Sequence, residues 1–144
     1  MSDFGFRRSN LRFDNKNKFE DLEVWQKAHK LTMEIYKVTN KFPKEEKYRL
    51  GDQLRRSVAS VATNIVEGNS RKHKKEFQQF LNMARSSLEE TKYHLLLARD
   101  LGYIQGKVYL SLQERSDQIG RMIYGLMQFL SNKSDIRNQK SEIL

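Results

Sequence analysis

Residues 53–68 read Gln-Leu-Arg-Arg-Ser-Val-Ala-Ser-Val-Ala-Thr-Asn-Ile-Val-Glu-Gly, and no other part of the 144-residue chain says more about its architecture. Apolar residues recur every three or four positions in and just before this stretch: Leu50, Leu54, Val58, Val61 and Ile65. This spacing is typical of a helix with one face in a hydrophobic core. We predict a helix from about Glu46 to Glu67, ended by Gly68-Asn69, because glycine readily adopts the left-handed conformation that follows many helices.

The same helix has an unusual outer side, since no charged residue occurs from Ser57 to Val66. At about 100° per residue, the side opposite the core carries small or apolar residues, and we call it the outer face: Ala59, Ala62, Thr63 and Val66. Polar residues form a third line beside the core line, and we call it the polar stripe: Gln53, Ser57, Ser60, Asn64 and Glu67.

A surface helix of a monomer normally shows charged residues to solvent. We therefore predict a homo-oligomer in which this helix packs on a neighbouring subunit, with the polar stripe as a hydrogen-bonded seam, since buried amides and hydroxyls need partners. The predicted interface residues are Gln53, Arg56, Ala59, Ser60, Thr63, Asn64, Val66 and Glu67. The alternative is a helix buried at the centre of a monomer.

Three further helices are expected on either side. The first begins after a capping Asp21, stops at Phe42-Pro43 and has one apolar line: Trp25, Ala28, Leu31, Ile35 and Val38. The next is capped by Ser70, ends at Gly102 and has the line Phe77, Phe80, Leu81, Ala84, Leu88, Thr91, Leu95 and Ala98. The last begins near Gln105 and has the line Tyr109, Leu112, Ile119, Ile123, Met127 and Leu130.

Four helices with short connections predict an all-α fold, an antiparallel up-down-up-down four-helix bundle. The bundle is expected over residues 19–130, after a basic flexible arm at residues 1–18 and before a loose C-terminal tail at residues 131–144. Neither terminal segment shows an apolar period.

Composition excludes several classes of protein and site. The chain has no cysteine, which excludes disulfides, thiolate zinc sites and a cysteine nucleophile. No apolar run approaches the roughly 18 residues of a membrane span, and the N-terminus lacks the apolar core of a signal peptide. We expect a soluble, cytoplasmic protein with no membrane partner.

Positive charge is concentrated outside the helical body. The net charge is +9, from 27 Lys and Arg against 18 Asp and Glu, and the connection between the second and third helices contributes +4 of it through what we call the basic connector: Arg71, Lys72, Lys74 and Lys75. The arm adds Arg7, Arg8 and Arg12, and Arg55 is expected to face outward. Cations gathered on loops and arms suit nucleic acid, although basic ends that only keep the protein soluble remain the alternative.

Catalytic and cofactor motifs are missing from the sequence. There is no phosphate-binding glycine loop and no Gly-x-Ser-x-Gly turn, and the three histidines are scattered. We expect no enzyme activity, no metal and no cofactor. Glu67 is the one carboxylate with a prospect of partial burial, and an ion pair with Arg56 or Arg71 is the simplest role for it.

The residues around the second helix resemble a known family. Phe42-Pro43, Glu46, Tyr48, Gln53-Leu54-Arg55-Arg56, Ser60, Asn64-Ile65 and Glu67-Gly68 resemble the four-helix bundle proteins, also called 23S rRNA intervening-sequence proteins. The resemblance spans about Phe19 to Leu130. Ser57 replaces the usual alanine, Ser86 replaces a common glycine, and the N-terminal arm is an addition.

The resemblance implies a bacterial homopentamer, similar to the accessory protein of diversity-generating retroelements, which binds nucleic acid and a reverse transcriptase. Our leading hypothesis is a non-catalytic homo-oligomer that binds nucleic acid, with RNA favoured by the family's genomic setting. The second is an oligomeric scaffold for a protein partner such as a reverse transcriptase. The third is a small-molecule or catalytic site in a subunit cleft near Asn64 and Glu67.

Overall fold

The computed structural model describes the backbone of residues 18–143 and the side chains of residues 18–132. Within this part the chain is helical and has no strand. The elements are a 3-10 helix at Phe19–Asp21, followed by α1 at Glu23–Thr39, α2 at Lys44–Lys47, α3 at Leu50–Asn69, α4 at Lys74–Asp100 and α5 at Gly106–Ile143.

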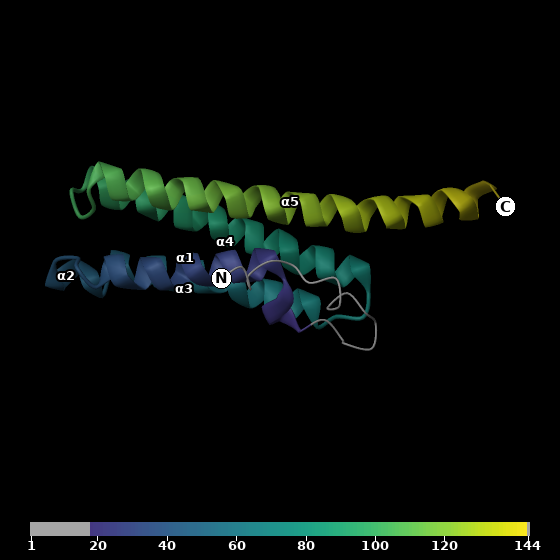
Figure 1. Cartoon of the computed structure of the whole chain (residues 1–144), viewed down its shortest axis with the longest axis horizontal. Helices are drawn as coiled ribbons and strands as arrows, with labels where there is room; N and C mark the ends of the chain where they lie inside the picture. Colours follow the sequence, from purple (N-terminus) through teal and green to yellow (C-terminus); the bar gives the residue numbers. More distant parts are fainter. Residues whose placement is uncertain (1–17, 144) are drawn as a thin grey trace.

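The four long helices form a closed bundle. Each packs on the next one along the chain, α1 on α3, α3 on α4 and α4 on α5, and α5 returns to contact α1. Figure 1 shows that successive long helices run in opposite directions, as short connections require. The all-helical bundle is therefore confirmed, and this arrangement fits the predicted up-down-up-down order. The α3–α4 connection lies at one end, and α2 and the α4–α5 connection lie at the other (Figure 1).

The predicted apolar lines form the core. All five residues of the α3 line are buried, with Leu54, Val58, Val61 and Ile65 at 0% exposure. Most members of the other three lines are buried as well, whereas Trp25, Val38, Phe77 and Met127 are partly buried and pack against the core. Helical periodicity was sufficient to find these residues because each helix has one apolar side to bury.

The predicted helix starts need correction. Asp21 lies in the 3-10 helix, and α1 begins after Leu22 with no side-chain cap. Ser70 does not start α4, because it ends α3 and its Oγ donates to the Glu67 carbonyl at 2.7 Å; α4 follows His73. Several neighbouring polar residues could each cap a helix, and the packing of the helices determines where the helix begins.

The predicted second helix is divided in two. The short α2 ends at Lys47, and Arg49 has φ −116° and ψ −89°, outside the helical region, before α3 begins at Leu50. The Arg55 guanidinium donates to the Lys47 carbonyl at 2.6 Å, which satisfies a carbonyl that the break leaves without a helical partner.

The last helix is longer than expected. We predict its end near Leu130 and a loose tail after it, whereas α5 continues to Ile143 and projects past the end of the other helices (Figure 1). Residues 131–143 contain neither glycine nor proline, so nothing in their sequence stops a helix that is already formed.

Gly68 and Gly102 are needed for different structural reasons. Gly102 has φ +81° directly after α4, as its predicted role at the helix end requires. Gly68 instead lies within the last turn of α3 and is buried against α4. A Cβ there would lie 2.8 Å from Phe77 Cδ1 and 2.9 Å from Phe80 Cβ. Gly68 is therefore needed for close approach of the two helices and not for a left-handed turn.

One ion pair links α4 to α5. Lys92 Nζ lies 2.8 Å from Asp117 Oδ1 and 3.7 Å from Glu89 Oε1. The hydrogen bond to Asp117 raises the pKa of Lys92 above its usual 10.5, although burial acts in the opposite direction. Because the pKa of Lys92 is higher in the folded state, its ion pair stabilises the protein fully at pH values below the unfolded-state pKa. This stabilisation is lost as the pH rises through the folded-state pKa.

Replacement of Gly68 by alanine tests the close approach. We expect Gly68→Ala to lower the free energy of unfolding by about 1–3 kcal/mol, because the added methyl group must displace an aromatic side chain or the α3 backbone. Chemical denaturation measures the change. Gly125→Ala is the matched control, since nothing lies within 4 Å of its Cβ position. Equal stability of both variants would contradict the role of Gly68.

Candidate nucleic-acid interface

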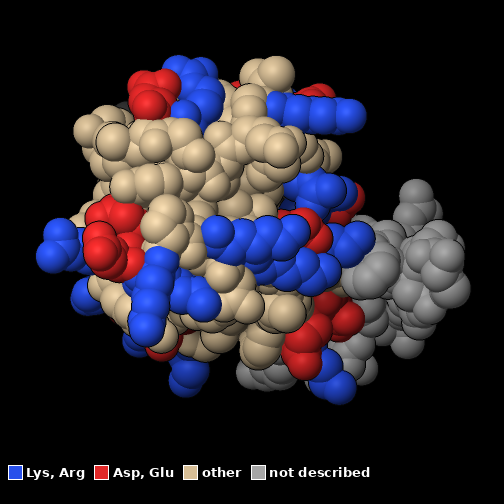
Figure 2. All heavy atoms as spheres, turned by 90° about the vertical axis from the view of Figure 1, so that its left-hand side faces the viewer, with Lys and Arg blue, Asp and Glu red and all other residues tan. Residues whose placement is uncertain are grey.

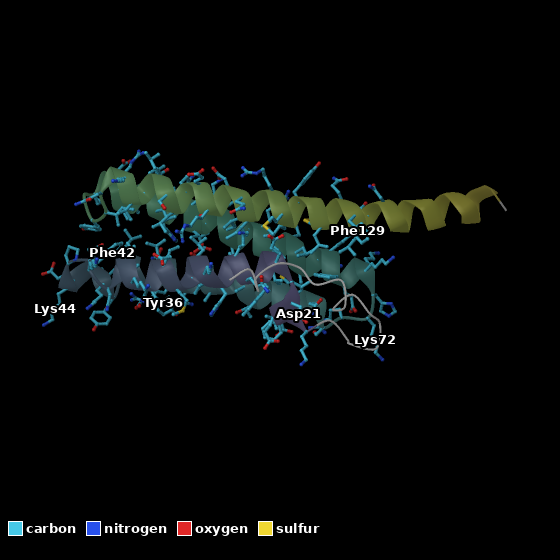
Figure 3. The ribbon with its side chains drawn as sticks, in the orientation of Figure 1. Asp21, Tyr36, Phe42, Lys44, Lys72 and Phe129 are labelled. Carbon is cyan, nitrogen blue, oxygen red and sulfur yellow. The ribbon has the colours of Figure 1, made fainter. Side chains whose placement is uncertain are left out.

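The basic connector lies at the α3–α4 end of the bundle. Arg71 is in the connection itself, where its Nη2 lies 3.4 Å from Glu67 Oε2 and its Cζ lies 4.7 Å from the centre of the Phe80 ring. The Glu67–Arg71 pair is therefore confirmed, but Glu67 is exposed and the expectation of partial burial is wrong. Figure 3 shows Lys72 pointing outward from this end.

The other two cations occupy the first turn of α4. Lys74 is half-buried and Lys75 is exposed. The positive end of the helix dipole disfavours cations at this position by about 0.3–1 kcal/mol each, whereas it favours anions. A bound polyanion would interact favourably with the exposed cations and with the helix end together.

Both ends of the bundle mix cations with carboxylates, since Glu67 and Glu76 lie beside the basic connector. Figure 2 faces the α2 end, where Lys and Arg side chains are interspersed with Asp and Glu. This end carries cations that sequence reasoning did not single out: Lys41, Lys44, Lys47, Arg49 and Lys107. Their recurrence every few residues is visible in the sequence, but the neighbouring Glu45 and Glu46 conceal it in a sum of charges. The predicted arm residues Arg7, Arg8 and Arg12 lie outside the described residues.

Arg55 does not face outward as expected. Only 17% of its side chain is exposed, and it pairs with Asp52. Its Nη1 donates to Thr39 Oγ1 at 2.9 Å and its Nη2 to the Lys47 carbonyl at 2.6 Å. These contacts join α1, α2 and α3 at the end of the bundle opposite the connector. Arg55 is therefore a structural residue, which sequence reasoning missed because its partners come from three separate segments.

The polar stripe of α3 finds much of its hydrogen bonding inside the chain. Thr91 Oγ1 donates to Ser57 Oγ at 2.8 Å, and Ser60 and Ser87 share a hydrogen bond of 2.9 Å between their hydroxyls. Asn64 Nδ2 donates to the Ser60 carbonyl at 2.8 Å. The hydroxyls of Ser57 and Ser60 join α3 to α4 of the same chain, and for the rest of the stripe a seam with a neighbouring subunit stays a prediction. Gln53 and Arg56 are exposed.

The outer face of α3 is only partly covered by the described residues of the chain. Ala59, Ala62 and Val66 are half-buried and Thr63 is exposed. The alternative of a helix buried at the centre of a monomer is therefore wrong. Among the described residues, the small and apolar side chains of this face stay partly exposed to solvent.

An aromatic cleft continues this surface onto α1 and α2. Tyr36, Met33 and Tyr48 are 46%, 51% and 70% exposed. They line a cleft of about 580 Å³ together with Lys37, Asn40, Lys47, Asp52 and Arg55. Asp52, Ala59 and Val66 follow at intervals of seven residues on α3, so the cleft and the outer face lie on the same side of that helix. Figure 3 shows Tyr36 pointing away from α5.

Two further results concern the described residues only. No group of three or more His, Asp and Glu side chains there is placed to hold a metal ion. None of the helices combines the length and the apolar character that crossing a bilayer requires.

The fold and this surface define a small all-helical bundle with a basic connector at one end, and comparison with known proteins gives its family. The family model of the 23S rRNA-intervening sequence protein matches residues 20–125. The chain belongs to this family, as its resemblance indicated. No curated protein matches it.

A solved structure supports the same assignment. The crystal structure of a protein with unknown function from the S23 ribosomal protein family of Bacteroides thetaiotaomicron is 26% identical, with a TM-score of 0.66. The similarity covers 72% of this chain and 97% of that chain.

The structural role of Arg55 is testable. We expect Arg55→Gln to lower the free energy of unfolding by about 1–3 kcal/mol, because Asp52 and the Lys47 carbonyl lose a charged donor. Any affinity for RNA should remain at the wild-type value when measured below the unfolding transition. If the variant kept its stability but bound RNA more weakly, Arg55 would instead be a residue of the RNA-binding surface.

Proposed function

We propose that the protein is a non-catalytic, cytoplasmic homo-oligomer that binds nucleic acid, with RNA favoured, through its basic connector. The observation that carries the proposal is the placement of four cations at one end of the bundle, two of them in the first turn of α4. The positive potential of that turn favours phosphate, so the cations and the helix end act in the same direction.

Oligomerisation would multiply this small patch. The outer face of α3 and the aromatic cleft offer a continuous surface of small, aromatic and mixed-charge side chains for a second copy. A ring such as the homopentamer implied by the family is the arrangement we favour. A ring would carry every connector on the same end. Several weak sites on one particle raise avidity without any new contact.

RNA is favoured because the family takes its name from intervening sequences of 23S rRNA. Lysine and arginine contact phosphates, which carry no sequence information, so binding should be weakly selective and should fall steeply with salt. The arm residues Arg7, Arg8 and Arg12 are proposed to add to this contact.

Removal of the connector charges tests the binding surface. We expect replacement of Arg71, Lys72, Lys74 and Lys75 by alanine to weaken binding of a single-stranded RNA by more than tenfold at low salt and to leave the oligomer size unchanged. The dependence of log K on log salt should become shallower by up to about 3, since each phosphate contact contributes about 0.7. Fluorescence anisotropy over a salt series measures both quantities.

A control variant removes the same number of charges from the other end of the bundle. It replaces Lys41, Lys44, Arg49 and Lys107 by alanine, and we expect a much smaller loss of affinity. Equal losses in both variants would mean that net charge alone drives binding. The absorbance ratio at 260 and 280 nm of protein purified at low salt gives an independent reading of bound nucleic acid.

A charge placed on the outer face of α3 tests whether this face forms the subunit contact. We expect Thr63→Glu to convert the oligomer to smaller species, because a charge would be buried at the subunit contact. Light scattering at micromolar concentration measures the mass, and circular dichroism checks that the bundle is intact. Ser111→Glu on the exposed side of α5 is the control. A monomeric wild-type protein would defeat the oligomer directly.

The aromatic cleft favours a second candidate function, an oligomeric scaffold for a protein partner such as a reverse transcriptase. Exposed tyrosine and methionine side chains are enriched at protein interfaces. One defined protein in fixed stoichiometry with the oligomer, and no nucleic acid in the sample, would favour the scaffold over the RNA-binding function.

A further inference from the structure

A second cationic site lies between α1 and α5, away from the connector. Lys27 and Lys30 of α1 and Arg115 and Gln118 of α5 line a cleft of about 170 Å³, which we call the cationic groove. Its floor is formed by Leu31 and Ile119, each only 1% exposed. The lining contains three cations and, among the residues that the structure describes, no carboxylate.

Lys30 has an interaction of its own, so the like charges that call for a compensating anion are those of Lys27 and Arg115. The acidic residues nearest to the groove cations along α1 are Glu23, four residues before Lys27, and Glu34, which pairs with Lys37 at 3.8 Å. No ion pair or hydrogen bond engages the side chain of Lys27 or Arg115 within the described part of the chain. Two adjacent cations at a protein surface repel each other. An anion bound between them attracts both, so the net electrostatic interaction becomes favourable.

The size of the groove limits what it can hold. Pockets for whole small molecules have volumes of about 300–1,000 Å³, and this groove is smaller. The groove is open to solvent and of a size that suits a phosphate group better than a whole small molecule. The lysine and arginine side chains and the Gln118 amide all donate hydrogen bonds, which suits phosphate oxygens.

The position of the groove leaves it open in the proposed oligomer. It contains no residue of α3, whose outer face is the proposed subunit contact. Lys27 and Lys30 lie four and seven residues after the start of α1, which places them about 6–10 Å along the helix axis from that start. The first residues of α1 and the connector lie at the same end of the bundle (Figure 1).

We propose that the cationic groove binds a backbone phosphate of the same RNA strand that the connector binds. This inference rests on the proposed function and adds a second contact to it, on the side of the bundle. The RNA would thus run from the connector end along α1 and α5. The bases would remain outside the groove, so the site adds affinity without sequence selectivity.

The test uses the full chain and a 20-nucleotide single-stranded RNA. The variant Lys27→Gln with Arg115→Gln should weaken binding and reduce the dependence of log K on log salt by about 1.4, since two phosphate-neutralising charges are lost. Its stability should equal or exceed that of the wild type, because two repelling charges are gone. The control Lys107→Gln with Arg121→Gln removes the same charge from exposed positions of α5 outside the groove.

The outcomes separate this inference from the proposed function. If the wild type binds no RNA at 50 mM salt, the proposed function and this inference both fail. If the connector variant loses affinity while the groove variant matches its control, the inference alone is overturned. Inorganic phosphate is the second probe, tested by its effect on the melting temperature at constant ionic strength. Stabilisation of the wild type but not of the groove variant, with unchanged RNA binding, would assign the groove to free phosphate.

Discussion

The close packing of α3 on α4 is the contact on which the rest of the bundle depends. Gly68 lets the last turn of α3 lie against Phe77 and Phe80, where a single methyl group would already be too close. Further along, Ser57 binds Thr91 by a hydrogen bond in the buried core. Small residues allow the close approach, and the hydroxyl partners prevent polar groups from being buried without hydrogen bonds, which would be costly.

This contact also determines which surfaces remain free. Because Ser57 and Ser60 of α3 pair with α4, the helix presents Ala59, Ala62 and Val66 on another side, where the described residues cover them only in part. The same arrangement places the basic connector at the end where α3 turns into α4. One packing arrangement therefore places the small side chains of α3 and the cations of the connector on different parts of the bundle.

Much of the fold was readable from the sequence, and much of the site was not. The four apolar lines identified the core because a helix repeats its buried side every three or four residues, and Gly102 marked the end of α4 correctly. Arg55 was misplaced because its partners, Thr39 and the Lys47 carbonyl, are distant in sequence. The cationic groove escaped notice for the same reason, since its cations come from the first and last helices.

The sequence by itself determined the helices, the core residues, the family and the excess of positive charge, because these depend on residue types and on short-range spacing. Only the tertiary structure decided where α3 breaks from α2, which hydroxyls pair across α3 and α4, and which cations share a cleft. Those features depend on how segments far apart in the chain meet. Periodicity shows which side of a helix is buried, but it does not show which neighbour buries it.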